Sequence, residues 1–326
     1  MVTDRWCARK KAQVMYVKVA NPVSFIRSLW QGAILKPDFV YMNSFLDPRF
    51  SIAPTVLARL GFFGRATIVL APRGEFGAAA LAIKARKKKA FLVVSRLIRL
   101  HSRIIWHASS DAEAEEIKVH RQDAQVEVRL NESTLPLTAL RQGRPCGGTI
   151  RLAFVSRISE IKGVDLLLEA ISTVRSDVSL DLYGSAIDSN YLQKCQEIAA
   201  QMPPNVQVAF RGSIDNSEVR DIFRNADAFF LPTKQENFGH AIAESLSAGC
   251  PVFVEDATPW TFVIKDGGGR IVPAHTVEAW SGALQGYCSL TPGDRTEMKA
   301  QAADAYERWR AGHEGPSVFD QILGRE

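Results

Sequence analysis

The segment Leu231–Val252 reads LPTKQENFGHAIAESLSAGCPV and carries two glutamates, Glu236 and Glu244, on either side of a glycine. Its pattern predicts the end of a strand, a polar loop, a helix that begins near Gly239, a glycine cap at Gly249 and a second strand. The backbone N–H groups in the first turn of such a helix have no acceptor within the helix, so they form a site suited to phosphate. A glycine at the start of the helix lets phosphate approach the backbone closely. The segment therefore predicts a βαβ unit with an anion-binding loop.

The sequence around this segment alternates short β-rich runs with helical patterns, which is typical of βαβ units around a parallel sheet. Apolar residues recur at helical spacing from Val164 to Val174 and predict a helix with one apolar stripe. The strands expected in the second half of the chain are Ile150–Val155, Val178–Tyr183, Val206–Phe210, Ala228–Leu231 and Pro251–Val254. The second half is therefore predicted to be a doubly wound α/β domain.

The first half shows the same alternation in a looser form. Its expected strands are Val14–Val19, Phe39–Asn43, Thr67–Ala71 and Ile104–Ala108. The stretch Leu135–Thr149 breaks both periodicities with prolines and glycines, so we expect the linker between two domains there. We predict an N-terminal domain at residues 1–147 and a C-terminal domain at residues 148–326 that ends in a helix. A chain of 326 residues with 46% hydrophobic residues can bury two such cores.

The basic and acidic residues are also distributed unequally between the two halves of the chain. Residues 1–150 hold 24 Lys and Arg against 11 Asp and Glu, whereas residues 151–326 hold 16 against 24. This asymmetry predicts that the first half faces something anionic, such as a membrane surface, a phosphate-bearing acceptor or nucleic acid. The five cysteines are dispersed without C-x-x-C spacing, which argues against a disulfide framework and against a zinc site.

A second charged motif follows the first strand of the C-terminal domain. It reads Ser156-Arg157-Ile-Ser-Glu-Ile-Lys162-Gly163. Arginine offers phosphate oxygens a planar fork, lysine offers a mobile point charge, and Gly163 opens the next helix. Each motif alone is weak, since a glutamate on an amphipathic helix is usually a solvated surface group. Both motifs, however, follow strands of one parallel sheet, at the carboxyl ends where such sheets bind ligands.

Together the two motifs resemble family 4 of the glycosyltransferases. The pattern E-x-F-G-x-x-x-x-E-x-x-x-x-G-x-P-V is similar to the Glu-x7-Glu motif of that family, and R-I-x-x-x-K-G is similar to its R-(L/I)-x-x-x-K-G segment. The resemblance implies the GT-B fold, in which two Rossmann-like domains face each other across a cleft. It also implies transfer of a sugar from a nucleotide-diphosphate donor, with retention at the anomeric carbon and without metal or another cofactor.

The resemblance also implies roles for individual residues. Arg157 and Lys162 would hold the donor diphosphate, Glu236 would orient the transferred sugar, and Glu244 would bind the ribose. Further donor-binding residues would be Asn237, Phe238, Gly239, His240 and Gly163. His240 is expected to pack or to contact the donor and not to bind metal, because no second ligand lies at metal-ligand spacing beside it.

The first half resembles the family less specifically. Its segments Pro37–Ser44 and Ala71–Phe76 have counterparts there, and they place Asn43, Arg73 and Glu75 on the acceptor or sugar side. The alternative is that Arg73 and Glu75 cap the neighbouring helix. The strand and glycine-rich loop that usually open the family's first domain are not found before residue 14, so we expect that domain to be incomplete. The acceptor implied by the resemblance is a polysaccharide, a glycolipid or a lipid-linked sugar.

A basic run marks a second expected surface. The stretch Lys84–Arg103 could form a basic amphipathic helix that lies on an anionic membrane, although a solvated helix face is the alternative. Nucleic acid is not expected as a partner, because the run lacks the aromatic interleaving of a base-stacking surface. No apolar run approaches the ~20 residues that span a bilayer. We therefore expect a cytoplasmic protein, peripheral on the inner face of the cell membrane.

Two rival functions remain open. One is a non-catalytic or inactive nucleotide-sugar-binding remnant of such an enzyme. The other is a sugar epimerase with the same fold, which should carry extra acid and base residues in the cleft.

Overall fold

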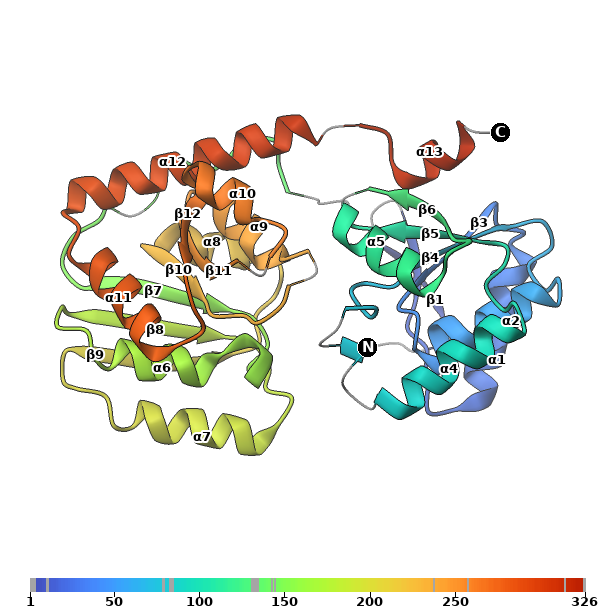
Figure 1. The fold of residues 1–326 in the computed structure, drawn as a ribbon, viewed down its shortest axis with the longest axis horizontal. Helices are drawn as coiled ribbons and strands as arrows, with labels where there is room; N and C mark the ends of the chain where they lie inside the picture. Colours follow the sequence, from blue (N-terminus) through green and yellow to red (C-terminus); the bar gives the residue numbers. More distant parts are fainter. Residues whose placement is uncertain are drawn as a thin grey trace. The chain divides into compact units, whose positions relative to one another are not determined.

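The computed structural model describes residues 4–9, 12–77, 80–81, 85–129, 135–141, 143, 145–236, 238–256, 258–313 and 315–324. The chain divides into two compact units, Met1–Leu130 together with Pro316–Glu326 (unit 1) and Asn131–Gly315 (unit 2) (Figure 1). Each unit is built around its own parallel sheet.

This division differs from the expected boundary after residue 147 at both ends of unit 2. Part of the expected linker packs along the helix α12 (Pro292–Gly312) of unit 2. The Tyr306 hydroxyl donates to the Pro136 carbonyl (2.7 Å), and the Ala139 N–H donates to Glu307 (2.9 Å). At the other end, Pro316–Glu326 belong to unit 1 and not to the second domain.

Unit 2 contains a six-stranded sheet in the order β12-β11-β10-β7-β8-β9, with every neighbouring pair parallel. The order reverses between β7 and β10, which makes the sheet doubly wound. The strands are β7 (Ile150–Val155), β8 (Val178–Tyr183), β9 (Val206–Gly212), β10 (Ala228–Leu231), β11 (Val252–Glu255) and β12 (Gly269–Val272). The five expected strands are therefore present, and β12 is an additional one.

The helices of unit 2 form two groups. Helix α6 contacts α7 and α11 in one group, and α9 contacts α8 and α12 in the other (Figure 1). The helices are η2 (Glu160–Lys162), α6 (Val164–Ile171), α7 (Ser189–Ala199), α8 (Val219–Asn225), α9 (His240–Ser247), α10 (Thr261–Val263), η3 (Ile264–Gly268), α11 (Val277–Cys288) and α12. The apolar stripe of α6 is buried as expected, from Val164 to Ile171.

Unit 1 contains a four-stranded parallel sheet in the order β3-β4-β5-β6. Its elements are β1 (Trp6–Arg9), β2 (Ala12–Met15), α1 (Pro22–Ile34), β3 (Phe39–Asn43), η1 (Pro48–Ile52), α2 (Ala53–Arg59), β4 (Thr67–Ala71), α4 (Ala85–Leu97), β5 (Ile104–Ala108), α5 (Asp111–His120), β6 (Gln125–Val128) and α13 (Val318–Leu323). The expected strand Val14–Val19 is wrong, because Ala12–Met15 instead pairs antiparallel with Trp6–Arg9. The strands expected at β3, β4 and β5 have the expected bounds.

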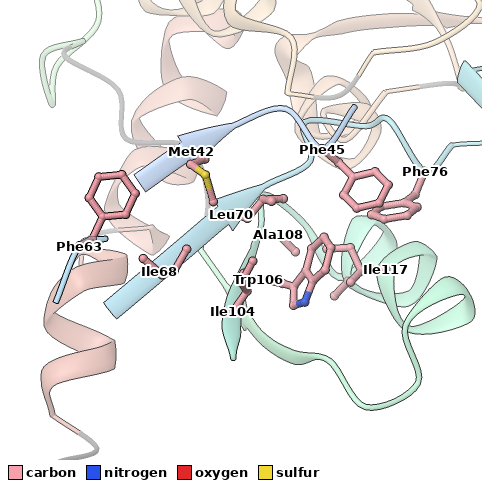
Figure 2. Packing of buried hydrophobic residues seen from close by; sticks show 11 residues of the cluster. Met42, Phe45, Phe63, Ile68, Leu70, Phe76, Ile104, Trp106, Ala108 and Ile117 are labelled. Carbon is pink, nitrogen blue, oxygen red and sulfur yellow. The ribbon is translucent and has the colours of Figure 1, made fainter. Parts of the chain in front are cut away.

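The main core of unit 1 lies between its sheet and the helices that connect the strands. Figure 2 shows the rings of Phe45 and Phe76 next to each other, with Trp106 and Ile117 beside them, and the Phe45 and Phe76 ring centres are 4.8 Å apart. A smaller cluster holds Val69 against Val318 and Ile322 of α13. The last helix of the chain is therefore part of the packing of unit 1.

Candidate functional site

The reversal of strand order in unit 2 places two loops next to each other. β7 and β10 are parallel neighbours, and Ala228 of β10 lies opposite Leu152 of β7. The loop after β7 carries Arg157 and Lys162, and the loop after β10 leads through Glu236 to α9. The carboxyl ends of strands at such a reversal are where doubly wound sheets bind their ligands.

A glycine lets these two loops touch. Gly163 ends η2 with φ 64° and ψ 36°, a left-handed conformation that favours glycine. A Cβ atom at this position would lie 2.3 Å from the carbonyl oxygen of Pro232. The Lys234 N–H donates to the Ile161 carbonyl (2.9 Å) and joins the loops a second time. Gly163, expected at the donor, therefore serves the contact between the loops.

Lys162 crosses from the first loop to the second. Its Nζ donates to Thr233 Oγ1 (3.3 Å), to the Gln235 carbonyl (3.3 Å) and to Glu236 Oε1. The Lys162 and Glu236 side chains are only 9% and 16% exposed. The structure therefore pairs two residues for which the sequence predicted separate ligand contacts. A buried pair of this kind neutralises both charges and ties the loops together.

Arg157 differs from Lys162 in that its side chain is exposed and has no hydrogen bond or ion pair within the described residues. Its guanidinium is therefore available to an anion. Glu244, on α9, is partly buried, and no hydrogen bond to its carboxylate is found in the described part of the chain. Burial raises the pKa of Glu244 to about 7. A carboxylate with a perturbed pKa and no partner among the described residues, on the helix that follows β10, is a candidate ligand contact.

The start of α9 has a specific backbone shape. Gly239 precedes it with φ 79° and ψ 55°. Phe238, expected among the donor-binding residues, is only 3% exposed, and its ring packs between His240 (4.7 Å between ring centres) and Trp260 (5.7 Å). Its side chain is therefore a packing residue. His240 is exposed. Asn237 lies outside the described residues.

The predicted acceptor-side residues lie at the carboxyl ends of β3 and β4 in unit 1. Arg73 has a left-handed backbone with φ 56°, and its Nε donates to Asn43 Oδ1 (2.9 Å). Glu75 accepts from Ser44 Oγ (2.8 Å) and from the N–H groups of Phe45 (2.5 Å) and Leu46 (2.8 Å). These contacts of Glu75 shape the loop after β3 and cap no helix, whereas Asn43 and Arg73 form a pair.

The Asn43–Arg73 pair is part of a longer series of hydrogen bonds that the sequence did not indicate. Arg73 Nη2 donates to the Tyr41 hydroxyl (2.9 Å), which lies 2.5 Å from His107 Nδ1, and His107 Nε2 lies 2.6 Å from the Arg129 carbonyl. A carbonyl only accepts, so Nε2 carries the proton and Tyr41 donates to Nδ1 in the neutral ring. The chain of donors fixes the orientation of Arg73. Tyr41 and His107 lie on strands expected from the sequence, but only the sheet register reveals the contact.

Within the described residues, no group of three or more His, Cys, Asp and Glu side chains is placed to hold a metal ion. The expectation of transfer without metal stays a prediction.

A doubly wound parallel sheet of this kind defines a Rossmann-like domain. The comparisons with known proteins agree. The profile of the glycosyl transferases group 1 matches residues 141–304, about half of the chain, and the chain belongs to this family.

Solved structures of low sequence identity show that the chain has the GT-B fold. HepE of Anabaena, in complex with UDP and glucose, aligns with a TM-score of 0.69 over 93% of this chain and 80% of that protein, at 14% identity. A TarM variant of S. aureus, in complex with Fondaparinux, alpha-GlcNAc-glycerol and UDP, aligns with a TM-score of 0.67 over 96% of this chain and 59% of that protein, at 12% identity.

Among curated relatives, the D-inositol 3-phosphate glycosyltransferase of Xylanimonas cellulosilytica is 28% identical over 187 residues, which cover 56% of this chain and 44% of that protein. The Streptomyces coelicolor protein of the same name is 29% identical over 177 residues, which cover 50% and 38%. The match with this chain spans less than half the length of these curated relatives.

Proposed function

We propose that this chain transfers a sugar from a nucleotide-diphosphate donor to a polysaccharide, a glycolipid or a lipid-linked acceptor, with retention at the anomeric carbon and without metal. The observation behind the proposal is the contact, at the strand reversal of unit 2, between the loop after β7, which carries Arg157 and Lys162, and the loop after β10, which carries Glu236 and leads into the helix of Glu244. Neighbours of the same fold bind UDP and UDP-glucose.

The four residues have the following roles in this proposal. Arg157 is the exposed guanidinium that meets the diphosphate as the donor enters. Lys162 pairs with Glu236, so in this proposal a bound diphosphate shares the charge of Lys162 with that carboxylate. Glu236 orients the transferred sugar. Glu244 accepts hydrogen bonds from the ribose hydroxyls.

In the proposed reaction, the bond between the anomeric carbon and the phosphate oxygen breaks as the acceptor oxygen bonds to that carbon on the same face. The acceptor proton moves to the departing phosphate oxygen. The leaving group gains negative charge in this step, and Arg157 and Lys162 stabilise that charge. Asn43 and Arg73 of unit 1 are the proposed contacts on the acceptor side.

We also propose that the protein is cytoplasmic and that unit 1 binds the inner face of the cell membrane. Between residues 12 and 110 the chain has 15 Lys and Arg but only three acidic residues, Asp38, Asp47 and Glu75. Helix α4 exposes Val93, Val94 and Leu97 between basic side chains. An amphipathic helix with basic and aliphatic residues is suited to an anionic lipid surface.

The end of the expected basic helix Lys84–Arg103 needs correction, whereas its first residue, Lys84, lies outside the described residues. The helix ends at Leu97, because Arg99 adopts φ 50° and the Leu100 N–H turns back to the Ser95 carbonyl (2.9 Å). Arg99 and Arg103 therefore follow the helix. In the part of the chain that the structure describes, no helix is both long and apolar enough to cross a bilayer.

The test is a thermal-shift screen of nucleotide sugars, followed by an assay for release of nucleoside diphosphate in the presence of lipid-linked acceptors. A donor at 100 times its dissociation constant stabilises a protein by ~2.7 kcal/mol. The proposal requires both a stabilising donor and acceptor-dependent release. Binding without turnover would favour the non-catalytic alternative, and change of the donor sugar without an acceptor would favour an epimerase.

A further inference from the structure

The loop that leads into α9 is held by an indole that the sequence motifs did not include. Trp260 lies between β11 and α10 and is only 2% exposed. Its Nε1–H donates to the carbonyl oxygen of Phe238, and its ring meets the Phe238 ring edge-on, with centres 5.7 Å apart. The indole therefore fixes the backbone carbonyl immediately before Gly239 through this hydrogen bond.

This hydrogen bond sets the direction of an amide. The peptide between Phe238 and Gly239 is planar and trans, so its C=O and N–H point in opposite directions. When the carbonyl is directed to Trp260, the Gly239 N–H is directed away from Trp260. A Cβ at Gly239 would lie 3.0 Å from Ile242 Cδ1 and 3.2 Å from Trp260 Cδ1. The close packing on this side leaves the loop little freedom to turn the peptide over.

Helix α12 packs against the Trp260 indole. Trp309 of α12 packs on Trp260 with ring centres 4.3 Å apart, and Tyr306 lies 5.8 Å from Trp309. Tyr306 is in turn tied to the Pro136 carbonyl. The position of Trp260 is therefore fixed by the long helix of unit 2 as well as by its own loop.

We propose that Trp260 is a positioning residue of the donor site, whose indole N–H aims the Gly239 N–H at the phosphate of the nucleotide sugar. The inference rests on the proposed function of this site. An amide at a helix N-terminus is a good phosphate donor only when it points at the anion. Trp260 acts through the backbone and does not itself touch the donor.

The experiment replaces the indole N–H and keeps an aromatic ring. In Trp260→Phe the Phe238 carbonyl loses its donor, so the peptide can rotate and the affinity for the donor is expected to fall roughly tenfold. Affinity is measured by calorimetry with UDP-glucose, or with the nucleotide sugar that gives the largest thermal shift. The ³¹P chemical shift of the bound donor is expected to change as well, because it reports contacts of the phosphates.

Tyr287→Phe is the matched control. The Tyr287 hydroxyl donates to the Asp227 carbonyl (2.6 Å), just before β10 and at the opposite end of that strand from the donor loop. It is also buried, at 1% exposure. The control loses the same kind of hydrogen bond to a backbone carbonyl, so it should lose stability but keep the donor affinity and the ³¹P shift of the parent.

If Trp260→Phe does not fold, Trp309→Leu replaces it in the test. This variant keeps the Trp260 indole N–H but removes the ring that packs on the indole. We expect a severalfold loss of donor affinity. Donor affinity and ³¹P shifts equal to those of the parent in the variant that folds would overturn the inference and leave the proposed function intact. An equal loss of affinity in Tyr287→Phe would also overturn it, since a general loss of stability would then be the cause. A parent chain that binds no nucleotide sugar would instead refute the proposed function.

Discussion

Lys162 holds the two loops of the candidate site together through three acceptors on the loop after β10. The side chains of Lys162 and Glu236 are mostly shielded from water, so each charge is stabilised mainly by the other. At the scale of single residues, stability and ligand binding are therefore linked at this position. Arg157 and Glu244, which lack such partners among the described residues, are the side chains with spare bonding capacity.

Lys162→Ala is expected to lower the free energy of unfolding by ~3–5 kcal/mol, because it leaves the Glu236 carboxylate buried without a counter-charge. The double variant Lys162→Ala with Glu236→Ala should lose less than the two single losses added together. Urea denaturation of the four proteins measures this coupling. Strictly additive losses would show that the pair does not interact.

Glu244 should make donor binding depend on pH. Burial raises its pKa to about 7, so its carboxylate is mostly protonated at pH 6 and mostly ionised at pH 8. Only the ionised form accepts freely from ribose hydroxyls, and the affinity for UDP-glucose should therefore rise about tenfold from pH 6 to pH 8. UDP-glucose is the suitable probe because its diphosphate does not titrate in this range. Calorimetry with Glu244→Gln should give a flat profile; the same slope in that variant would contradict the assignment.

At the level of helices and strands, two glycines allow neighbouring elements to approach each other closely. Gly163 allows the loops after β7 and β10 to touch, and Gly269 opens β12, where a Cβ would lie 1.9 Å from the Val252 carbonyl. β10, which is a continuous apolar run, and β7, which is apolar except for Arg151, could be predicted from the sequence with their bounds. β12 could not, because its glycine and Arg270 leave no apolar run and its place depends on contact with β11.

The candidate site could be predicted in part for the same reason. Both charged motifs follow strands that the periodicity identifies. It was therefore predictable that the motifs lie together at the carboxyl ends of one sheet. The pairing of Lys162 with Glu236 was not, because it depends on loop geometry between residues far apart in the sequence. The same holds for the contacts of Trp260 with Phe238 and of Tyr41 with His107, which no sequence motif indicates.

Gly163→Ala should cost at least ~2 kcal/mol of stability and weaken donor binding, since the left-handed conformation strains alanine and the new methyl meets the Pro232 carbonyl at 2.3 Å. Gly212→Ala is the control. Gly212 also has a left-handed conformation (φ 73°), but a Cβ there meets nothing within 4 Å. That variant should lose only ~1–2 kcal/mol and bind donor normally. Thermal unfolding and calorimetry compare the two, and equal donor affinity in both variants would contradict the account.

At the scale of the whole molecule, the two units differ in how they treat apolar surface. In unit 2 the strands β10 and β11 are buried almost throughout, whereas α1 of unit 1 has no buried residue and exposes Val23, Ile26 and Trp30. Helix α4 adds exposed aliphatic side chains in a strongly basic part of the chain. Such a surface is rare on a protein that has no partner for it.

Binding to anionic vesicles should depend on these side chains. Val94→Ser with Leu97→Ser is expected to reduce sedimentation with phosphatidylglycerol vesicles several-fold, because each buried CH₂ contributes ~0.8 kcal/mol. Val119→Ser is the control, since Val119 is 72% exposed on α5 but lies outside the basic stretch. Raising the salt concentration should weaken binding of the parent. Equal binding to neutral vesicles, or an equal loss in the control, would contradict the proposed surface.

Binding of a nucleotide sugar by unit 2, at the reversal between β7 and β10, is tested most simply by a calorimetric titration of the full chain and of Arg157→Ala with UDP-, GDP-, ADP- and dTDP-sugars. We expect at least one donor to bind the parent with one-to-one stoichiometry. Arg157→Ala should weaken this binding roughly tenfold or more, through loss of a charge-assisted hydrogen bond. Failure of every donor to bind the parent, or unchanged affinity in Arg157→Ala, would refute the proposed donor site.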